Sequence, residues 1–262
     1  MKLIDIHTHI YPDEIARKAT DSIRNFYQIG GANNTDGTVR MLLDRGGQAG
    51  ISQYVILPVA IRPDRVQGIN NFIHEKAQEY DCMIPFGTVH AAMEGMAEEV
   101  ERIFAMGMKG IKLHPDSSQF AIDDPRLFPM YEAIEGKIPI LLHMGDRRYD
   151  YSHPARLRRV LDLFPKLDAI AAHFGGYSMY ETACQLLRDT NCFMDVSSSM
   201  MFMEEGVAEH YINLYGAERM MFGTDYPLWD PLEETERFLR LRLTPDQMEQ
   251  IGHKTAETLL GL

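Results

Sequence analysis

Short apolar runs recur along the chain, and each ends in a polar or Gly/Pro-rich stretch. The runs are nearly continuous in apolar residues, which is typical of strands buried on both faces of a parallel sheet. The pattern predicts eight strands, within residues 2–9, 53–60, 83–90, 109–115, 138–145, 167–176, 192–199 and 219–227.

Segments with helical periodicity separate the later runs, and a last one closes the chain. They cover residues 68–80, 95–107, 125–137, 154–166, 179–191, 206–219 and 244–262. In the last segment, Thr244 is a good N-cap and Pro245 occupies the first helical position, where its missing N–H costs nothing. Strands alternating with helices over roughly 250 residues predict an α/β chain, a single (β/α)8 TIM barrel that spans residues 1–262 as one domain.

The longest irregular stretch is residues 27–38, after the first predicted strand. A loop at this place lies over the mouth of the barrel. Two interpretations have equal weight: a lid or substrate loop, and a mobile surface loop.

Composition and charge narrow the class of protein. The 262 residues are 45% hydrophobic and 24% charged, as in ordinary globular chains. The net charge of −12 and the lack of a Lys/Arg block argue against nucleic acid as a partner, and no apolar stretch is long enough to cross a membrane. The expected partner is a small-molecule substrate. A homodimer is the commonest soluble oligomer and is the expected one.

The three cysteines are scattered and form no CxxC pair. This distribution argues against a disulfide framework and fits a reducing compartment. The start of the chain has no signal-peptide pattern, so the expected location is the cytoplasm.

Polar residues end several of the predicted strands, where a barrel of this kind carries its active site. His7 and His9 are two residues apart and therefore share one face of the first strand. The later strand ends add a lysine, three histidines and an aspartate, namely Lys112, His114, His143, His173 and Asp225. Imidazole and carboxylate groups are the usual ligands of a catalytic divalent metal. Such a metal lowers the pKa of its bound water to about 7, and a nearby carboxylate then acts as general base.

These strand ends resemble the amidohydrolase superfamily. The stretches "DIHTH", "GIKLHP", "LLHMG", "AHFGG" and "FGTDYP" occur in the family's order. They look most like the branch of small metal-dependent hydrolases that includes the aminocarboxymuconate-semialdehyde decarboxylase group. The resemblance implies that His7, His9 and His143 are metal ligands and that Asp225 is both a ligand and a proton shuttle. It makes His173 either the residue that polarises water or substrate, or a ligand of a second metal.

Lys112 is the ambiguous residue of the set. In binuclear relatives the lysine at this place carries CO2 as a bridging carbamate. There are two alternatives. Lys112 can be a cation that binds a substrate carboxylate, or it can pair structurally with Asp225 or Asp116. The resemblance favours one metal ion over two. Zn is the first expectation, with Mn, Fe and Ni as alternatives.

The sequence defines the substrate-binding residues and the reaction less closely than the metal ligands. His114, Arg147, Tyr11 and Tyr226 lie at or just past strand ends and are the expected substrate-binding residues, with Lys112. The favoured reaction is attack of a metal-activated water on an amide, ester or lactone. The alternative is non-oxidative decarboxylation of an aromatic or unsaturated acid, which the "MGD" after His143 argues against. A third hypothesis is a non-catalytic barrel that binds a ligand.

Overall fold

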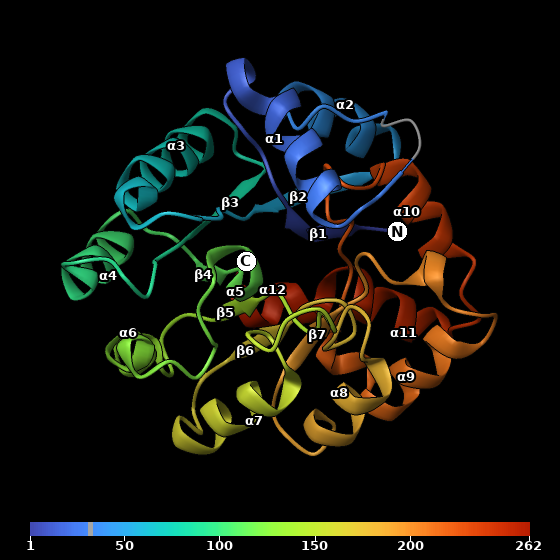
Figure 1. Ribbon diagram of the computed structural model, residues 1–262. Helices are drawn as coiled ribbons and strands as arrows, with labels where there is room; N and C mark the ends of the chain where they lie inside the picture. Colours follow the sequence, from blue (N-terminus) through green and yellow to red (C-terminus); the bar gives the residue numbers. More distant parts are fainter. Residues whose placement is uncertain (31–33) are drawn as a thin grey trace.

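The computed structural model describes residues 1–30 and 34–262 and has the predicted barrel architecture. Eight parallel strands follow one another around the sheet in chain order, as Figure 1 shows. Each observed strand overlaps one predicted run. The strands are β1 (Leu3–Thr8), β2 (Ile51–Ile56), β3 (Met83–Gly87), β4 (Gly110–Leu113), β5 (Ile140–Leu142), β6 (Ala169–Ala171), β7 (Phe193–Asp195) and β8 (Met220–Met221).

The barrel closes between β1 and the chain around β8. Ile6 N donates to Phe222 O at 3.0 Å, and Thr8 forms a parallel bridge with Tyr226. This closure brings the two ends of the sequence together, so the first and last polar strand ends become neighbours.

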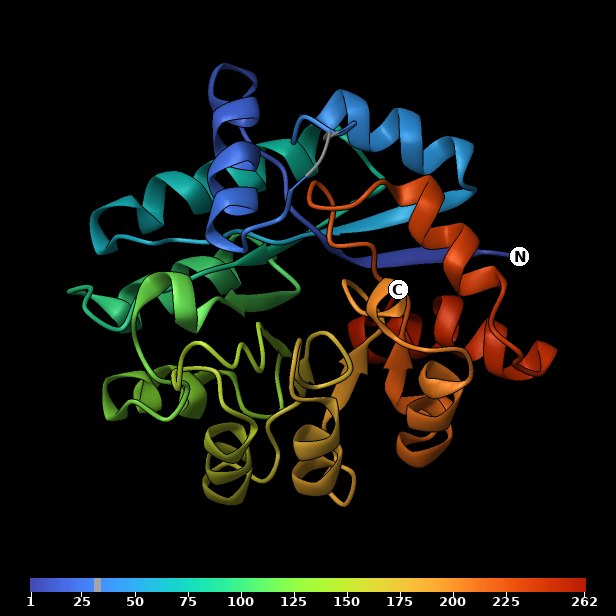
Figure 2. The same ribbon diagram turned by 45° about the vertical axis from the view of Figure 1, so that its right-hand side comes forward.

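Helices surround the strands on the outside (Figure 2). The α-helices are α1 (Asp13–Phe26), α2 (Val39–Gln48), α3 (Val66–Glu79), α4 (Met96–Ala105), α5 (Pro115–Ser118), α6 (Phe128–Ile134), α7 (Pro154–Leu163), α8 (Tyr180–Leu187), α9 (Val207–Tyr215), α10 (Pro231–Leu239), α11 (Pro245–Glu249) and α12 (Thr255–Leu260), with a π-helical turn at Gln250–Lys254. The predicted N-cap is present, because the Thr244 side chain accepts from Gln247 N.

Two apolar layers explain the continuous apolar runs. Every residue of β1 is buried. Ile4 and Ile6 belong to the smaller cluster inside the barrel, whereas Leu3 belongs to the larger cluster between the sheet and the helices. Both faces of the strands are therefore shielded from water, as expected for a parallel sheet. Within the part of the chain that the structure describes, no helix is long and apolar enough to cross a membrane.

Helices α1, α2, α5 and α10 were not predicted from the apolar pattern. In α1, the buried residues are Ala16, Thr20 and Arg24, which are small or polar, whereas the apolar Ile23 and Phe26 line a cavity at the mouth of the barrel. The predicted loop 27–38 begins directly after α1. Part of that prediction, residues 31–33, lies outside the described residues.

Glu234 in α10 is a buried carboxyl group far from the strand-end histidines in sequence. One oxygen pairs with Arg237, while Oε2 has no hydrogen-bond partner among the described residues. Burial raises the pKa of Glu234 from its ordinary 4.5 to about 8. The folded chain therefore keeps this proton up to about pH 8, whereas the unfolded chain releases it near pH 4.5, so the group's contribution to stability falls as pH rises through this window.

We expect the substitution Glu234→Gln to remove this pH dependence. The difference in melting temperature, variant minus wild type, should increase from pH 5 to pH 8 in thermal denaturation. Glu236→Gln, an exposed position on the same helix, is the control and should show a constant difference. A constant difference for Glu234→Gln as well would contradict the prediction.

Candidate active site

The mouth of the barrel joins the end of β1 to the segment that follows β8. Asp225 N donates to His7 O at 2.8 Å, and His9 N donates to Tyr226 O at 2.7 Å. The side chains of His7, His9 and Asp225 are buried. These backbone bonds therefore place two imidazoles and one carboxylate together, although 216 residues separate His9 from Asp225 in sequence.

The two imidazoles of the HxH pair are oriented by bonds to their Nδ1 atoms. His9 Nδ1 lies 2.8 Å from Leu57 O, and His7 Nδ1 lies 2.8 Å from a carboxylate oxygen of Asp195. In consequence, Nε2 of each ring lies 3.5 Å from Asp225 Oδ1. Two ligand atoms bound about 2.1 Å from one tetrahedral ion are about 3.4 Å apart. Each of these two nitrogen–oxygen distances fits a pair of ligands on one divalent metal.

His173, after β6, joins the same group. One donor atom from each of His7, His173 and Asp225 lies within 4.8 Å of the other two, and all three residues are buried. His173 and Asp225 have φ values of +61° and +59°, a region that residues other than glycine seldom occupy. Such strained backbone is concentrated at functional sites. Nitrogen and carboxylate donors of this kind can hold a divalent metal.

His143, the predicted ligand after β5, contacts this group through His173 but is not one of its three members. Its Nδ1 lies 3.1 Å from His173 Nε2, and its ring stacks on His114 with centroids 4.0 Å apart. The structure therefore brings His143 to the site. It gives His173 rather than His143 the place among the three converging donors.

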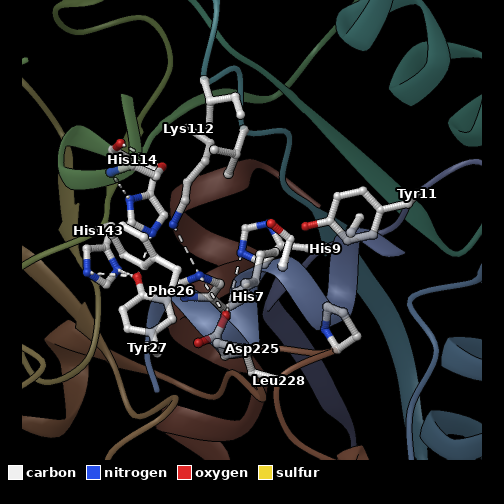
Figure 3. Close-up of a pocket in the computed structure, with 17 residues that line it drawn as sticks. His7, His9, Tyr11, Phe26, Tyr27, Lys112, His114, His143, Asp225 and Leu228 are labelled. Atoms are coloured by element: carbon white, nitrogen blue, oxygen red, sulfur yellow. Dashed lines mark hydrogen bonds and ion pairs between the residues drawn. The ribbon is translucent and has the colours of Figure 1, made fainter. Parts of the chain in front are cut away.

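Lys112 lies at the centre of the site with no exposed surface. Its Nζ is 3.1 Å from His7 Nε2, and Figure 3 shows it pointing toward the histidines and Asp225. Burial lowers the pKa of Lys112 to about 8, while Asp225 and Asp195 oppose that decrease. At neutral pH the group remains mainly an ammonium ion.

Burial and neighbouring groups shift the pKa values of His7, His173 and Asp225. It lowers the pKa of His7 to about 4, with a further decrease from Lys112, and it lowers that of His173. Burial alone would raise the pKa of Asp225, but the neighbouring imidazoles, His7 first, hold it below its usual range. Near pH 7 the imidazoles of His7 and His173 are therefore neutral and the Asp225 carboxylate is ionised.

A cavity of about 310 Å³ opens onto these groups. The polar groups on its surface include His7, His9, Lys112, His114, His143 and Asp225. Its apolar lining includes Ile23 and Phe26 of α1, Val59 and Ile61 after β2, and Leu228 after β8. The cavity can accept a small apolar body with a polar group directed at the floor.

Tyr27 is a cavity residue that the strand-end pattern did not predict. Its hydroxyl lies 2.6 Å from His114 Nε2, and the ring is part of the cavity wall. Arg148 lies over the rings of Phe26 and Tyr27 and donates to Phe26 O at 2.6 Å. The end of α1 is thus fastened to the loop after β5. The only sequence signal was its position in a loop expected over the barrel mouth.

The predicted substrate-binding residues divide into two sets. Tyr11 and His114 line the cavity beside Lys112. Arg147 lines a neighbouring cavity of about 470 Å³, on the other side of Tyr27. Tyr226 lines neither, because its ring is fully buried and its hydroxyl donates to Thr38 O at 2.8 Å. The structure gives Tyr226 a packing role.

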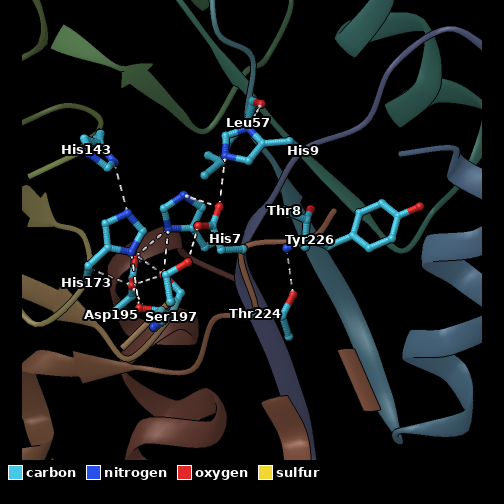
Figure 4. Close-up of polar contacts among 12 residues, drawn as sticks. His7, Thr8, His9, Leu57, His143, His173, Asp195, Ser197, Thr224 and Tyr226 are labelled. Atoms are coloured by element: carbon cyan, nitrogen blue, oxygen red, sulfur yellow. Dashed lines mark hydrogen bonds and ion pairs between the residues drawn. The ribbon is translucent and has the colours of Figure 1, made fainter. Parts of the chain in front are cut away.

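Asp195, at the end of β7, is a second residue that sequence reasoning missed. It contacts His7 directly and is fully buried. Figure 4 shows it beneath the rings of His7 and His173. A signal was present in the sequence, since Asp195 is the single charged residue in the seventh predicted run, 192–199.

Comparison with known proteins gives one family and a set of related folds. A family model described as Amidohydrolase matches residues 4–262. An uncharacterized TIM-barrel protein from Bordetella bronchiseptica is 27% identical, with a TM-score of 0.82, and the match covers 100% of this chain and 99% of that chain.

Two decarboxylase structures have the same fold at lower identity. The 2,6-dihydroxybenzoate decarboxylase from Rhizobium is 17% identical, with a TM-score of 0.75, over 100% of this chain and 99% of that chain. A dihydroxybenzoic acid decarboxylase from Polaromonas sp. JS666, with bound manganese and the inhibitor 2-nitroresorcinol, is 15% identical, with a TM-score of 0.77, over 100% and 97%.

Proposed function

The chain belongs to the amidohydrolase family, whose model matches nearly its whole length, and on this premise we propose that it is a metal-dependent, non-oxidative decarboxylase. Its substrate is a small aromatic or unsaturated carboxylic acid. The decarboxylase folds among its structural neighbours support this choice over hydrolysis.

The observation that carries the proposal is the placement of Lys112. This buried ammonium lines a cavity with many apolar residues, next to His7, His9 and Asp225. A carboxylate is the natural partner of a buried ammonium, because an unpaired buried charge is costly. The apolar residues above it suit the carbon skeleton of the acid.

The proposed ligands of one divalent ion are His7, His9, Asp225 and His173, with His143 as the alternative to His173. When bound, the ion supplies a Lewis acid that orients the carboxylate and polarises water. Manganese and zinc both suit these donors. Manganese has added support from the decarboxylase structure that contains it.

In the reaction, the bond between the substrate's α-carbon and its carboxyl carbon breaks and CO2 leaves. The electron pair stays on carbon, and a proton takes the place of CO2. Lys112 holds the carboxylate, and the apolar lining excludes water from it. Loss of CO2 disperses the charge into the unsaturated skeleton, which an apolar wall penalises less than a localised charge. Asp225, which receives a hydrogen bond from Ser198 Oγ, takes a proton from water and delivers it to the carbon, and the hydroxide that remains combines with the released CO2 as bicarbonate.

Hydrolysis, the reaction favoured in the sequence analysis, is the second candidate. The observation in its favour is that three protein donors leave room for water at a metal. In that case Asp225 accepts the proton of the attacking water, and His173 stabilises the oxyanion.

Metal removal tests the function. Elemental mass spectrometry on the purified chain should give about one equivalent of metal. A panel of hydroxybenzoates and unsaturated acids should include a substrate that releases CO2. We expect a chelator to abolish that release and added Mn or Zn to restore it, because the metal supplies the Lewis acid that orients the carboxylate.

Esters and lactones assayed in parallel distinguish the two reactions. Turnover of an ester or lactone without CO2 release from any acid would favour hydrolysis. A chain that binds no metal, even after Mn or Zn is added, would contradict both candidates and favour a non-catalytic barrel.

A further inference from the structure

Asp195, the last residue of β7, contacts the predicted metal ligand His7 through its carboxylate. The residue has no exposed surface, and its Oδ2 lies 2.8 Å from His7 Nδ1. His7 Nε2, on the opposite side of the ring, faces Lys112 Nζ at 3.1 Å and Asp225 Oδ1 at 3.5 Å. The two nitrogens of this imidazole therefore face two different sets of partners.

The other oxygen of Asp195 is fixed by three donors. Oδ1 accepts from His173 N at 3.0 Å, from Ser197 N at 3.0 Å and from Ser197 Oγ at 2.5 Å. The Ser197 hydroxyl oxygen also lies 3.0 Å from His173 Nδ1 (Figure 4). Asp195 and Ser197 thus hold both imidazoles by their Nδ1 sides. With three donors on Oδ1, the carboxylate cannot rotate without losing hydrogen bonds.

We propose that Asp195 is a positioning residue that fixes the tautomer of His7, keeping the proton on Nδ1 and leaving the lone pair of Nε2 for a metal. The proposal deepens the proposed function and rests on it for the identity of the group at Nε2. A neutral imidazole carries one proton, so Nε2 can ligate a metal only when Nδ1 is the donor. Carboxylates that receive such a bond orient metal-ligating histidines and increase their basicity.

Lys112 supports the same tautomer from the opposite side of the ring. A lysine nitrogen carries N–H donors in either charge state, and a bond donated from Lys112 Nζ to His7 Nε2 uses the lone pair that this tautomer leaves there. The charges are consistent with this arrangement. The three hydrogen bonds donated to Asp195 Oδ1 favour the ionised carboxylate, whose Oδ2 can then only accept from His7 Nδ1.

The substitution Asp195→Asn tests the proposal without changing the shape of the side chain. The three donors at Oδ1 should retain the amide oxygen, so the amide NH2 would face His7 Nδ1. That nitrogen must then accept, and the proton moves to Nε2, where it blocks the metal position. We expect nitrogen-15 NMR of labelled histidines to show His7 protonated on Nδ1 in the wild type and on Nε2 in the variant. Metal affinity should fall about 10- to 100-fold in titrations with Mn or Zn.

Asp5→Asn is the matched control. Asp5 is equally buried in β1, but it accepts from the backbone of His7 and from Thr224 rather than from an imidazole ring. This variant should keep the wild-type tautomer and wild-type metal affinity. An equal loss of affinity in both variants would point to general damage and overturn the positioning role.

The NMR measurement separates this proposal from the proposed function. Wild-type His7 protonated on Nε2 would overturn the positioning role, and this result needs no variant, so it decides the matter even if Asp195→Asn does not fold. An unchanged tautomer in Asp195→Asn would also overturn it. A tautomer that switches as expected in a chain that binds no metal would support the positioning role and contradict the proposed function.

Discussion

Substitution of Asp225 with asparagine is expected to lower turnover by about 10²- to 10⁴-fold, the usual contribution of a positioned acid–base group. Asp225 Oδ1 lies 3.5 Å from Nε2 of both His7 and His9, and Oδ2 accepts from Ser198 Oγ. Asparagine keeps the shape and the backbone bonds that close the barrel. It removes the negative charge that balances a metal and the site that carries the proton.

The fold should remain intact in this variant. Asp225→Asn also removes a buried charge, so we expect its melting temperature to stay within a few degrees of wild type. Steady-state kinetics with the identified substrate, circular dichroism and metal content together separate loss of chemistry from loss of structure.

Asp230→Asn is the control for Asp225→Asn. Asp230 follows in the same segment, where it caps α10 and pairs with Arg45, and neither residue lines the cavity. Asparagine is an equally good cap, so this variant should retain activity with a small loss of stability from the ion pair. If Asp225→Asn kept more than a tenth of the wild-type turnover, the assignment of the proton carrier would be wrong.

Lys112→Met is expected to have opposite effects on activity and on stability. Lys112 is fully buried and contacts His7 through its ammonium group. Methionine fills a similar volume without the desolvated charge, so we expect the free energy of unfolding to increase by about 1 kcal/mol or more. Loss of a charged hydrogen bond to the substrate carboxylate, about 1.5–3 kcal/mol, should lower kcat/KM by roughly 10- to 150-fold.

Denaturant unfolding and kinetics on the same preparations test both effects. Lys109→Met, at an exposed position just before β4, is the control and should leave both quantities nearly unchanged. A variant at Lys112 that is less active toward acids and equally active toward a neutral ester would support carboxylate binding. Loss of one metal equivalent from a wild type that holds two would instead favour the carbamate alternative.

The preference for hydrolysis in the sequence analysis rested on local sequence. The "MGD" that follows His143 describes one strand end. A reaction depends on what surrounds the metal ligands. The apolar lining of the cavity comes from α1 and from segments after β2 and β8, which no single stretch of sequence contains.

The sequence by itself determined the barrel and most of its polar mouth. Continuous apolar runs predict strands covered on both faces, and parallel strands place their carboxyl ends at one edge. Both rules depend on local pattern and chain order alone. They sufficed to bring His7, His9, Lys112 and Asp225 to one site, and the structure places these residues together.

Only the tertiary structure decided the arrangement inside that mouth. Helix α1 buries Ala16 and Thr20 and places Ile23 and Phe26 in the cavity lining, so the place of Tyr27 in the cavity depends on how this helix packs on the barrel. That His173 and not His143 belongs to the converging donors depends on which ring lies within reach of His7 and Asp225. The bond from His7 to Asp195 spans 188 residues. Orientation and long-range hydrogen bonding arise only once the barrel has closed, because they depend on distances that no local pattern of residues encodes.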